Sequence, residues 1–284
     1  MDPIVVVGDA LIDEIRDDAG VREFVGGAAL NVAVGLARLG AEATLIAMVG
    51  DDGPGERIRD FLAEHGVRLI ASPSPLGTAR AVSTRVGGEP QYVFNEAARN
   101  RHISFDAAAR DAVTRAPLVA VSCVALDSPG QVTELARTLS DARLAIDPNP
   151  REGMMRDRAA FVDGFSRLAA GAALVKVGAD DAALLGLGSV DDLARRLRRD
   201  ASAVLATRGS GGATILAGER ELTRPIADLP GPIVDTMGAG DAMFASFVAA
   251  LAADPHPDWA GVLDRALRVA AATCRAEGAL LRLP

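Results

Sequence analysis

The sequence contains few lysines, cysteines and aromatic residues. Its 284 residues include a single lysine, Lys176, two cysteines and 4% aromatic residues. Because no lysine ends a glycine-rich loop, the chain cannot carry the GxxxxGK[ST] phosphate-binding motif of P-loop enzymes. Cys123 and Cys274 lie far apart in the sequence. They fit no metal-binding spacing, which is typical of buried thiols in a reducing cytoplasm.

Segments that would direct the chain to a membrane or to nucleic acid are also absent. The apolar stretch "AMFASFVAALAA" at 242–253 is too short to span a bilayer. The N-terminal "MDPIVVVGDALIDEI" has no basic region before its apolar run, so we expect no signal peptide. The net charge of −8 disfavours a phosphate backbone as a partner. We therefore expect a soluble cytoplasmic protein that binds neither nucleic acid nor membranes.

What the sequence does contain is an alternation of apolar runs with helical patterns. Hydrophobic residues make up 49% of the chain and charged residues 24%, which is typical of a large folded core. The strand-like runs lie at 4–8, 43–50, 117–124, 143–147, 173–178 and 203–209. The helical patterns lie at 27–39, 54–65, 106–115, 129–140, 157–170 and 189–199. Strands separated by helices predict an α/β fold with a doubly wound, mostly parallel sheet and helices on both faces.

Two segments break this alternation. "ARAVSTRVGGEPQYVFNEA" at 79–97 alternates apolar and polar residues around Gly87-Gly88, which is typical of a hairpin. "DEIRDDAGVREFVGG" at 13–27 is short and alternates in the same way. We interpret them as a small β lid, formed from about 12–26 and 77–103, on a single domain of residues 1–284. A solvated surface meander fits the pattern equally well.

The stretch "DTMGAGDAMFASF" at 235–247 places three small residues before an acid at the start of a helical run. The N–H groups of Gly238, Ala239 and Gly240 can bind an anion there, because glycine allows close approach of the backbone. Asp241 would repel that anion unless it had another task. Removing the proton from a hydroxyl that attacks phosphorus is such a task. A helix N-cap after a glycine turn is the simpler alternative.

This stretch has a counterpart near the N-terminus, "GGAALNVAVGLARLG" at 26–40, where a Gly-Gly pair precedes Asn on a helix. Together they resemble the two signatures of the ribokinase-like (PfkB) carbohydrate kinases. "VGDALIDE", "VGDDGPGERI", "DPNPR" at 147–151 and "TRGSGG" at 207–212 follow in the family's order. The resemblance covers essentially the whole chain. It implies a ribokinase-like fold and an ATP-dependent sugar kinase that uses Mg²⁺.

The resemblance also implies a role for each matching residue. The implied catalytic group consists of the base Asp241 and the anion hole of Gly238, Ala239 and Gly240. Substrate binding is implied for Asp13, Gly27, Asn31, Phe94 and Asp127. Nucleotide binding is implied for Arg151, Lys176, Thr207 and Gly209.

Several of these residues have simpler interpretations. Asp13 could be a turn residue at a strand end, and Asp127 could cap the helix expected from 129. Phe94 could pack on the sugar or serve as an edge-strand aromatic in a dimer. Arg151 could be a solvated surface arginine.

The chain departs from the family's pattern at four positions. Val177 stands where many relatives have an Asn of the magnesium shell, and Asp180 stands where they have a Glu. Asp180 is therefore the candidate metal residue, with a monovalent cation (K⁺) expected near Asp235. Ala28 and Leu11 replace a Lys and a ribose-binding Asn, which points to the fructokinase-like branch and a hexose.

Other functions remain open from the sequence alone. A ribokinase or nucleoside kinase of the same family, or a sugar-binding sensor without catalysis, would share most of these residues. A nucleotide-binding dehydrogenase is disfavoured, since neither "GSGG" nor "GAGD" is a GxGxxG after the first strand. The resemblance also favours a homodimer formed through the lid.

Overall fold

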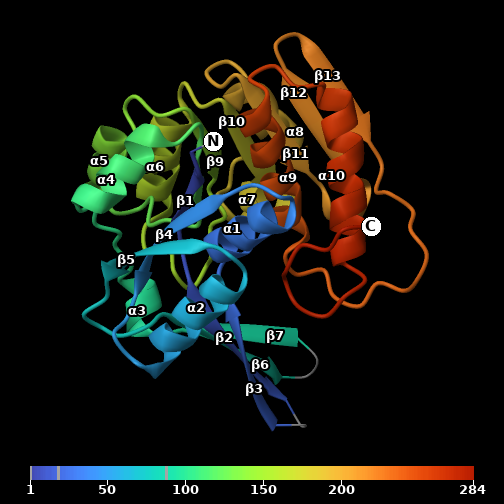
Figure 1. Cartoon of the computed structure of the whole chain (residues 1–284). Helices are drawn as coiled ribbons and strands as arrows, with labels where there is room; N and C mark the ends of the chain where they lie inside the picture. Colours follow the sequence, from blue (N-terminus) through green and yellow to red (C-terminus); the bar gives the residue numbers. More distant parts are fainter. Residues whose placement is uncertain (1, 18–19, 87–88) are drawn as a thin grey trace.

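Two β-sheets organise the chain in the computed structural model, which describes residues 2–17, 20–86 and 89–284 (Figure 1). The large sheet consists, in spatial order, of β13 (Arg220–Arg224), β12 (Ala213–Ala217), β11 (Ala203–Thr207), β10 (Leu174–Gly178), β9 (Leu144–Asp147), β8 (Val119–Ser122), β1 (Ile4–Gly8), β4 (Ala43–Val49) and β5 (Arg68–Pro73). The small sheet consists of β3 (Gly20–Gly26), β2 (Leu11–Asp17), β6 (Arg80–Val86) and β7 (Glu89–Phe94).

The large sheet is the doubly wound sheet that the sequence predicts. The strands from β11 to β5 pair in parallel, and only β12 and β13 add an antiparallel hairpin at one edge. One face packs against α1 (Ala28–Arg38), α2 (Gly53–Glu64), α9 (Ala239–Ala253) and α10 (Trp259–Thr273). The other face packs against α4 (Ala107–Arg115), α5 (Pro129–Thr138), α6 (Arg158–Ala169), α7 (Ala179–Leu184) and α8 (Val190–Leu197).

The apolar runs of the strands reflect burial on both faces. In β1, Ile4 and Val6 join the core under α1 and α9, whereas Val5 and Val7 join the core on the other face. Such strands read as continuous apolar segments because every second side chain enters a different core. The predicted helices and strands therefore agree with the structure, with small shifts at their ends.

Strand β1 marks the point where the strand order of the sheet reverses. It lies between β4 and β8, and the chain crosses to both sides of it. Ligands of open α/β sheets bind outside the carboxyl ends of the strands at such a point. The carboxyl ends of β1, β8, β9 and β10 are thus the expected location of the site.

The four-stranded sheet forms the lid and lies beside the large sheet (Figure 1). Strand β2 pairs antiparallel with β3 and parallel with β6, and β6 pairs antiparallel with β7. This replaces the alternative of a surface meander, while Gly87-Gly88 lie outside the described residues. The last strand of the sheet ends at Phe94, and the lid boundary at about 103 stays a prediction. Asn95 caps the short helix α3 (Glu96–Arg99), which ends the sheet at Phe94.

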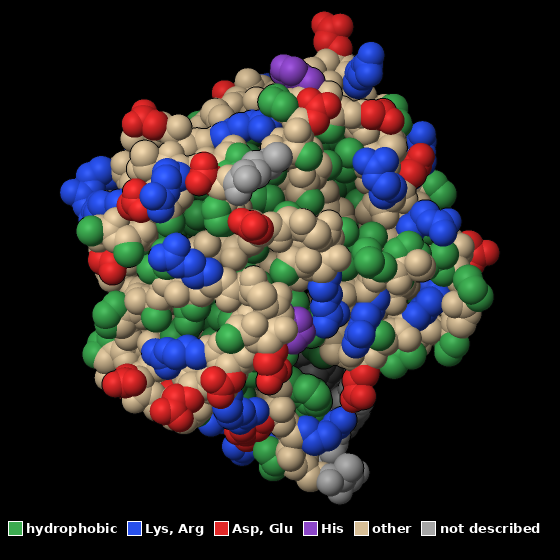
Figure 2. Space-filling model, in the orientation of Figure 1, with side chains coloured by type: hydrophobic (Ala, Val, Ile, Leu, Met, Phe, Trp, Pro, Cys, Tyr) green, Lys and Arg blue, Asp and Glu red, His purple; other side chains and the backbone are tan. Residues whose placement is uncertain are grey.

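The surface of the molecule mixes charges of both signs. On the face seen in Figure 2, acidic and basic side chains alternate over helices and lid, with no large area of one sign. Within residues 2–17, 20–86 and 89–284, every helix is too short or too polar to cross a bilayer.

Candidate active site

The site is built around the start of α9. Gly238 precedes the helix with φ 74°, and a Cβ at this position would lie 1.9 Å from the carbonyl oxygen of Ala279. Only glycine meets both demands, because an L-residue strains at this φ and its side chain would collide with backbone. The "GAGD" turn is therefore held in one conformation against the C-terminal segment.

Asp241 lies in the first turn of α9 and is 8% exposed. Asn31 in α1 donates a hydrogen bond from Nδ2 to its Oδ2 at 2.9 Å. Burial raises the pKa of Asp241, and the bond from Asn31 and the charges of Lys176 and Arg151 oppose that rise. A buried carboxylate with one oriented oxygen and a raised pKa is suited to accept a proton at neutral pH.

The backbone beside Asp241 presents free donors. Ala239 N–H contacts the carbonyl of Thr236 at 3.4 Å, and Ala242 N–H donates to that of Gly238 at 2.8 Å. In the described chain, the N–H groups of Gly238, Gly240 and Asp241 find no acceptor. Unpaired N–H groups at a helix start bind anions. Two of the three N–H groups predicted to form the anion hole, those of Gly238 and Gly240, are thus unpaired, and that of Asp241 lies beside them.

Lys176 lies directly behind this turn. A Cβ on Gly240 would be 3.3 Å from its Nζ, so the ammonium faces the backbone that would hold an anion. Nζ also lies 2.9 Å from Oδ2 of Asp147 and 4.0 Å from Oδ2 of Asp181. Burial disfavours the ammonium, but these carboxylates outweigh that effect and raise the pKa of Lys176. The only lysine of the chain is therefore a buried, permanent charge and not a surface residue.

Asp13 lies on strand β2 of the lid and belongs to the same site. Its Oδ2 lies over Gly26, where a Cβ would approach it to 2.1 Å. Gly27 has φ 117° and its Cβ would lie 2.7 Å from the carbonyl oxygen of Asp9, so the Gly-Gly pair is required by close packing. Burial and the charge of Asp9 raise the pKa of Asp13 to about 7, against the opposing charge of Arg151.

Asn31 keeps one hydrogen-bonding atom without a partner. Oδ1 of Asn31 is buried and has no partner among the described residues. Buried polar atoms are nearly always paired, so an unpaired one next to Asp241 indicates a place for a ligand hydroxyl.

Phe94 faces inward from the lid. The register of the four strands aligns Asp13, Phe24, Ala81 and Phe94 in one row. Phe94 is 9% exposed, and a Cβ on Gly153 would touch its ring at 2.7 Å. Its burial agrees with a role under the lid and leaves little of the ring for a dimer contact.

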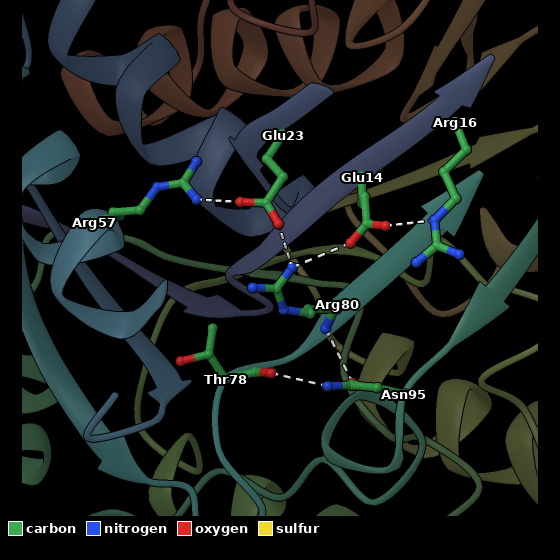
Figure 3. A network of polar contacts seen from close by, with 7 residues as sticks. All are labelled: Glu14, Arg16, Glu23, Arg57, Thr78, Arg80 and Asn95. Carbon is green, nitrogen blue, oxygen red and sulfur yellow. Dashed lines mark hydrogen bonds and ion pairs between the residues drawn. The ribbon is translucent and has the colours of Figure 1, made fainter. Parts of the chain in front are cut away.

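The opposite face of the lid carries an ion-pair network (Figure 3). Arg80 on β6 pairs with Glu14 on β2 at 3.2 Å and with Glu23 on β3 at 2.5 Å. Arg57 of α2 pairs with Glu23, so the network connects the lid to the large domain. Thr78 and Asn95 continue it, since Asn95 donates to the carbonyl of Thr78 and accepts from Arg80 N–H. The network fixes the lid strands that carry Asp13 and Phe94.

The residues predicted to bind nucleotide are less tightly gathered. Thr207 ends β11, beside Gly178 of β10, and Gly209 follows in an exposed turn with φ 52°. Arg151 lies at the surface, but its charge acts on Asp9, Asp13 and Asp241. Arg151 therefore stands next to the substrate acids.

Two predicted residues do not join the cluster in this structure. Oδ2 of Asp127 accepts the backbone N–H groups of Arg156 and Asp157, at 2.7 and 3.4 Å. The alternative that Asp127 caps α5 is wrong, because Ser128 is the N-cap. Asp180 is exposed, whereas its neighbour Asp181 is buried on the Lys176 side.

Three acids of the site were not singled out from the sequence. Asp9 and Asp147 stand at the ends of apolar strands, a signal that could have identified them. Asp181 accepts the N–H of Gly178 at 2.6 Å, and this places it inside while Asp180 faces outward. No group of three metal-ligating side chains occurs in the part of the chain that the structure describes.

Known carbohydrate kinases are similar to this chain over most of its length. The model of the pfkB family carbohydrate kinases matches residues 1–284. A fructokinase from Klebsiella pneumoniae is 31% identical, over 99% of this chain and 96% of its own, and one from Rhizobium leguminosarum bv. trifolii is 30% identical, over 88% and 80%. The crystal structure of a fructokinase with bound ATP from Xylella fastidiosa is 21% identical and superposes with a TM-score of 0.79, over 98% of this chain and 93% of that one.

Proposed function

We propose, from the premise that this chain belongs to the pfkB family of carbohydrate kinases, that it transfers the γ-phosphoryl group of ATP to a hydroxyl of fructose or a related hexose. The observation that carries the proposal is the buried carboxylate of Asp241 beside the unpaired N–H groups of Gly240 and Asp241. A base and an anion site in contact are what phosphoryl transfer to an alcohol requires.

In this reaction Asp241 accepts the proton of the sugar hydroxyl. The hydroxyl oxygen forms a bond to the γ-phosphorus as the bond to the β-phosphate oxygen breaks, and ADP leaves. The N–H groups of Gly240 and Asp241 bind the transferred group, with the ammonium of Lys176 behind them. These donors are in place before the reaction, so they stabilise its developing charge without reorganisation.

Asp13 and Asn31 hold the sugar. Carboxylate and amide oxygens accept hydrogen bonds from sugar hydroxyls, and Oδ1 of Asn31 is unpaired. Leu11 and Ala28 are buried in an apolar cluster with Phe94, and none of the three offers a polar side chain. Since the relatives reported above are named fructokinases, fructose is the first substrate to test.

ATP would lie over the carboxyl ends of β10 and β11. Thr207 and Gly209 face the nucleotide in this proposal, and Arg151 meets the γ-phosphate from the sugar side. Mg²⁺ usually keeps several waters and binds one or two carboxylates together with substrate phosphates, so a three-ligand cluster is not needed. Asp181 would hold it through water, in place of the exposed Asp180. The ion would neutralise charge on the β- and γ-phosphates.

Three expectations from the sequence complete the proposal. The oxygens of Asp235 accept N–H groups of Met237 and Gly278, and carbonyls of this loop are the proposed ligands of K⁺.

The lid exposes Val21 and Val93, which are 63% and 64% accessible and suited to a homodimer contact. Sedimentation of the protein tests the dimer, activity in Na⁺ against K⁺ tests the cation, and fractionation of cells tests a cytoplasmic location.

Release of ADP over a panel of acceptors tests the function. The panel holds fructose, glucose, ribose, adenosine and a sample without sugar, each with ATP and Mg²⁺. The proposal expects sugar-dependent ADP release with fructose ahead of ribose. Preference for ribose or adenosine contradicts the fructokinase assignment. Sugar binding without turnover on any acceptor identifies a sensor instead of a kinase.

A further inference from the structure

A small cavity lies where the lid meets the large sheet. It is lined from the end of β1 by Asp9, from the lid by Leu11 and Ala79, and from the segment after α3 by Arg101. Its volume is about 20 Å³, which holds one water molecule or one hydroxyl group and no ring.

Arg101 is an unusual residue to find in such a place. It is 9% exposed, and no other arginine is buried among the described residues. Its Nη atoms donate to the carbonyls of Met154, Val124 and Ala98, at 3.2, 3.2 and 3.4 Å. Its Nε is buried and has no partner in the described chain. A donor left unpaired in the interior is costly unless a ligand or water completes it.

Asp9 connects the cavity to the proposed sugar site. It lines the cavity, and its charge raises the pKa of both Asp13 and Asp241. Its Oδ1 accepts the N–H of Ala29 in the first turn of α1, the helix that also carries Asn31. Through Asp9 and Leu11 the cavity therefore contacts α1 and β2, the two elements that carry Asn31 and Asp13.

The chemistry of the two polar side chains selects the occupant. Nε of an arginine only donates, and a carboxylate only accepts. A hydroxyl satisfies both, because it accepts from one and donates to the other. A carboxylate or phosphate would be repelled by Asp9, and a nucleobase exceeds the volume.

We propose that this cavity receives one hydroxyl of the sugar, which accepts a hydrogen bond from Nε of Arg101 and donates one to Asp9. Arg101 is then a specificity-determining residue that selects sugars carrying a hydroxyl at that end of the molecule. The inference rests on the proposed sugar kinase function and adds to it the residue that recognises one particular hydroxyl.

The test compares fructose with a series of monodeoxy fructoses, each lacking one hydroxyl other than the phosphorylated one. In the parent, one analogue should lose about 10- to 100-fold in kcat/KM, the effect of a lost hydrogen bond to a charged group. In Arg101→Met, kcat/KM for fructose should fall by a similar factor. For the sensitive analogue, kcat/KM should fall little below its value with the parent protein. Such non-additivity is the signature of a direct contact.

Two further variants separate recognition from folding. Arg99→Met removes an exposed arginine from the same segment and should leave the substrate profile within about twofold of the parent. Ala98→Val adds methyl groups to the cavity wall and should reduce kcat/KM for fructose more than for the sensitive analogue. It provides the same test if Arg101→Met does not fold, which a thermal melt of each variant shows.

The outcomes distinguish this inference from the function on which it rests. A parent that phosphorylates fructose, with deoxy profiles unchanged in Arg101→Met and Ala98→Val, overturns the inference alone and makes Arg101 a structural residue. A parent without turnover on any sugar overturns the proposed function and the inference with it.

Discussion

The large sheet and the lid use ion pairs in opposite ways. In the large sheet Lys176 and Asp147 form a pair that is almost completely buried, with side-chain exposures of 8% and 0%. Between the lid and α2, the paired side chains of Glu23 and Arg57 are 28% and 45% exposed. A buried charge that loses its partner is costly, whereas an exposed pair contributes little. The large sheet therefore provides a fixed electrostatic site, whereas the ion pair between the lid and α2 contributes little to stability.

The difference places the chemistry at the junction of the two sheets. Asp241 and Lys176 come from the large domain, and Asp13 comes from the lid. The large domain can hold the base and the anion site in register, while the lid can cover the sugar. The following changes measure that contrast, beginning with the largest expected effect.

Removing the buried lysine should destabilise the whole protein. Lys176→Met leaves Asp147 without its partner, and such changes cost about 3–5 kcal/mol. Urea unfolding measures the loss. Replacing both partners, as in Lys176→Met with Asp147→Leu, should recover most of the stability and none of the activity. Equal stability of parent and Lys176→Met would show that the pair is not the electrostatic centre of the large sheet.

Removing the acid of the lid should affect sugar binding and spare the fold. Asp13→Ala deletes an acceptor for sugar hydroxyls, so sugar affinity should fall by about 10- to 100-fold. ATP affinity should remain, because the phosphates bind at α9. Calorimetric titration with each ligand measures both affinities. Unchanged sugar binding would remove Asp13 from the site.

The same residue should make stability depend on pH. The pKa of Asp13 is about 7 in the folded protein and near 3.8 in the unfolded chain. The folded state holds its proton more tightly, so its contribution is fully present below pH 3.8 and is lost as pH rises through 7. The free energy of unfolding of Asp13→Asn relative to the parent should therefore increase between pH 4 and pH 8. A difference in unfolding free energy that stays constant over that range contradicts the raised pKa of Asp13.

Breaking the link between lid and α2 should have the smallest effect on stability. Arg57→Met removes an exposed partner of Glu23, and we expect a loss of at most about 1 kcal/mol. The KM for sugar should rise without a change in kcat, and high salt should produce the same shift in the parent. Arg68→Met, an exposed arginine on β5, serves as the control. A loss as large as that of Lys176→Met would mean that both sheets are held alike.

The sequence predicts the large sheet better than it predicts the site. Apolar strands such as β1 reveal double burial directly, because every side chain in them enters a core. The "GAGD" turn identifies Asp241, since small residues before an acid serve backbone approach. These features are local, and local patterns are what a sequence displays.

Features that depend on a contact between distant segments were missed or misplaced. Whether Asp180 or Asp181 faces Lys176 depends on α7 beginning after Gly178, which a shift of one residue reverses. Arg101 reads as an ordinary polar residue in "RNRHIS", and only the packing of β8, α3 and the lid buries it. The contact of Ala239 N–H with the carbonyl of Thr236, which leaves the N–H groups of Gly238, Gly240 and Asp241 for an anion, is likewise invisible in the sequence.

Turnover of Asp241→Asn with fructose and ATP tests the central assignment most directly. Asparagine keeps the shape and the contact with Asn31 but cannot accept the hydroxyl proton. The account predicts a fall in kcat of about two to four orders of magnitude, the contribution of general-base catalysis, with ATP and sugar still bound. A kcat within about tenfold of the parent would contradict Asp241 as the base.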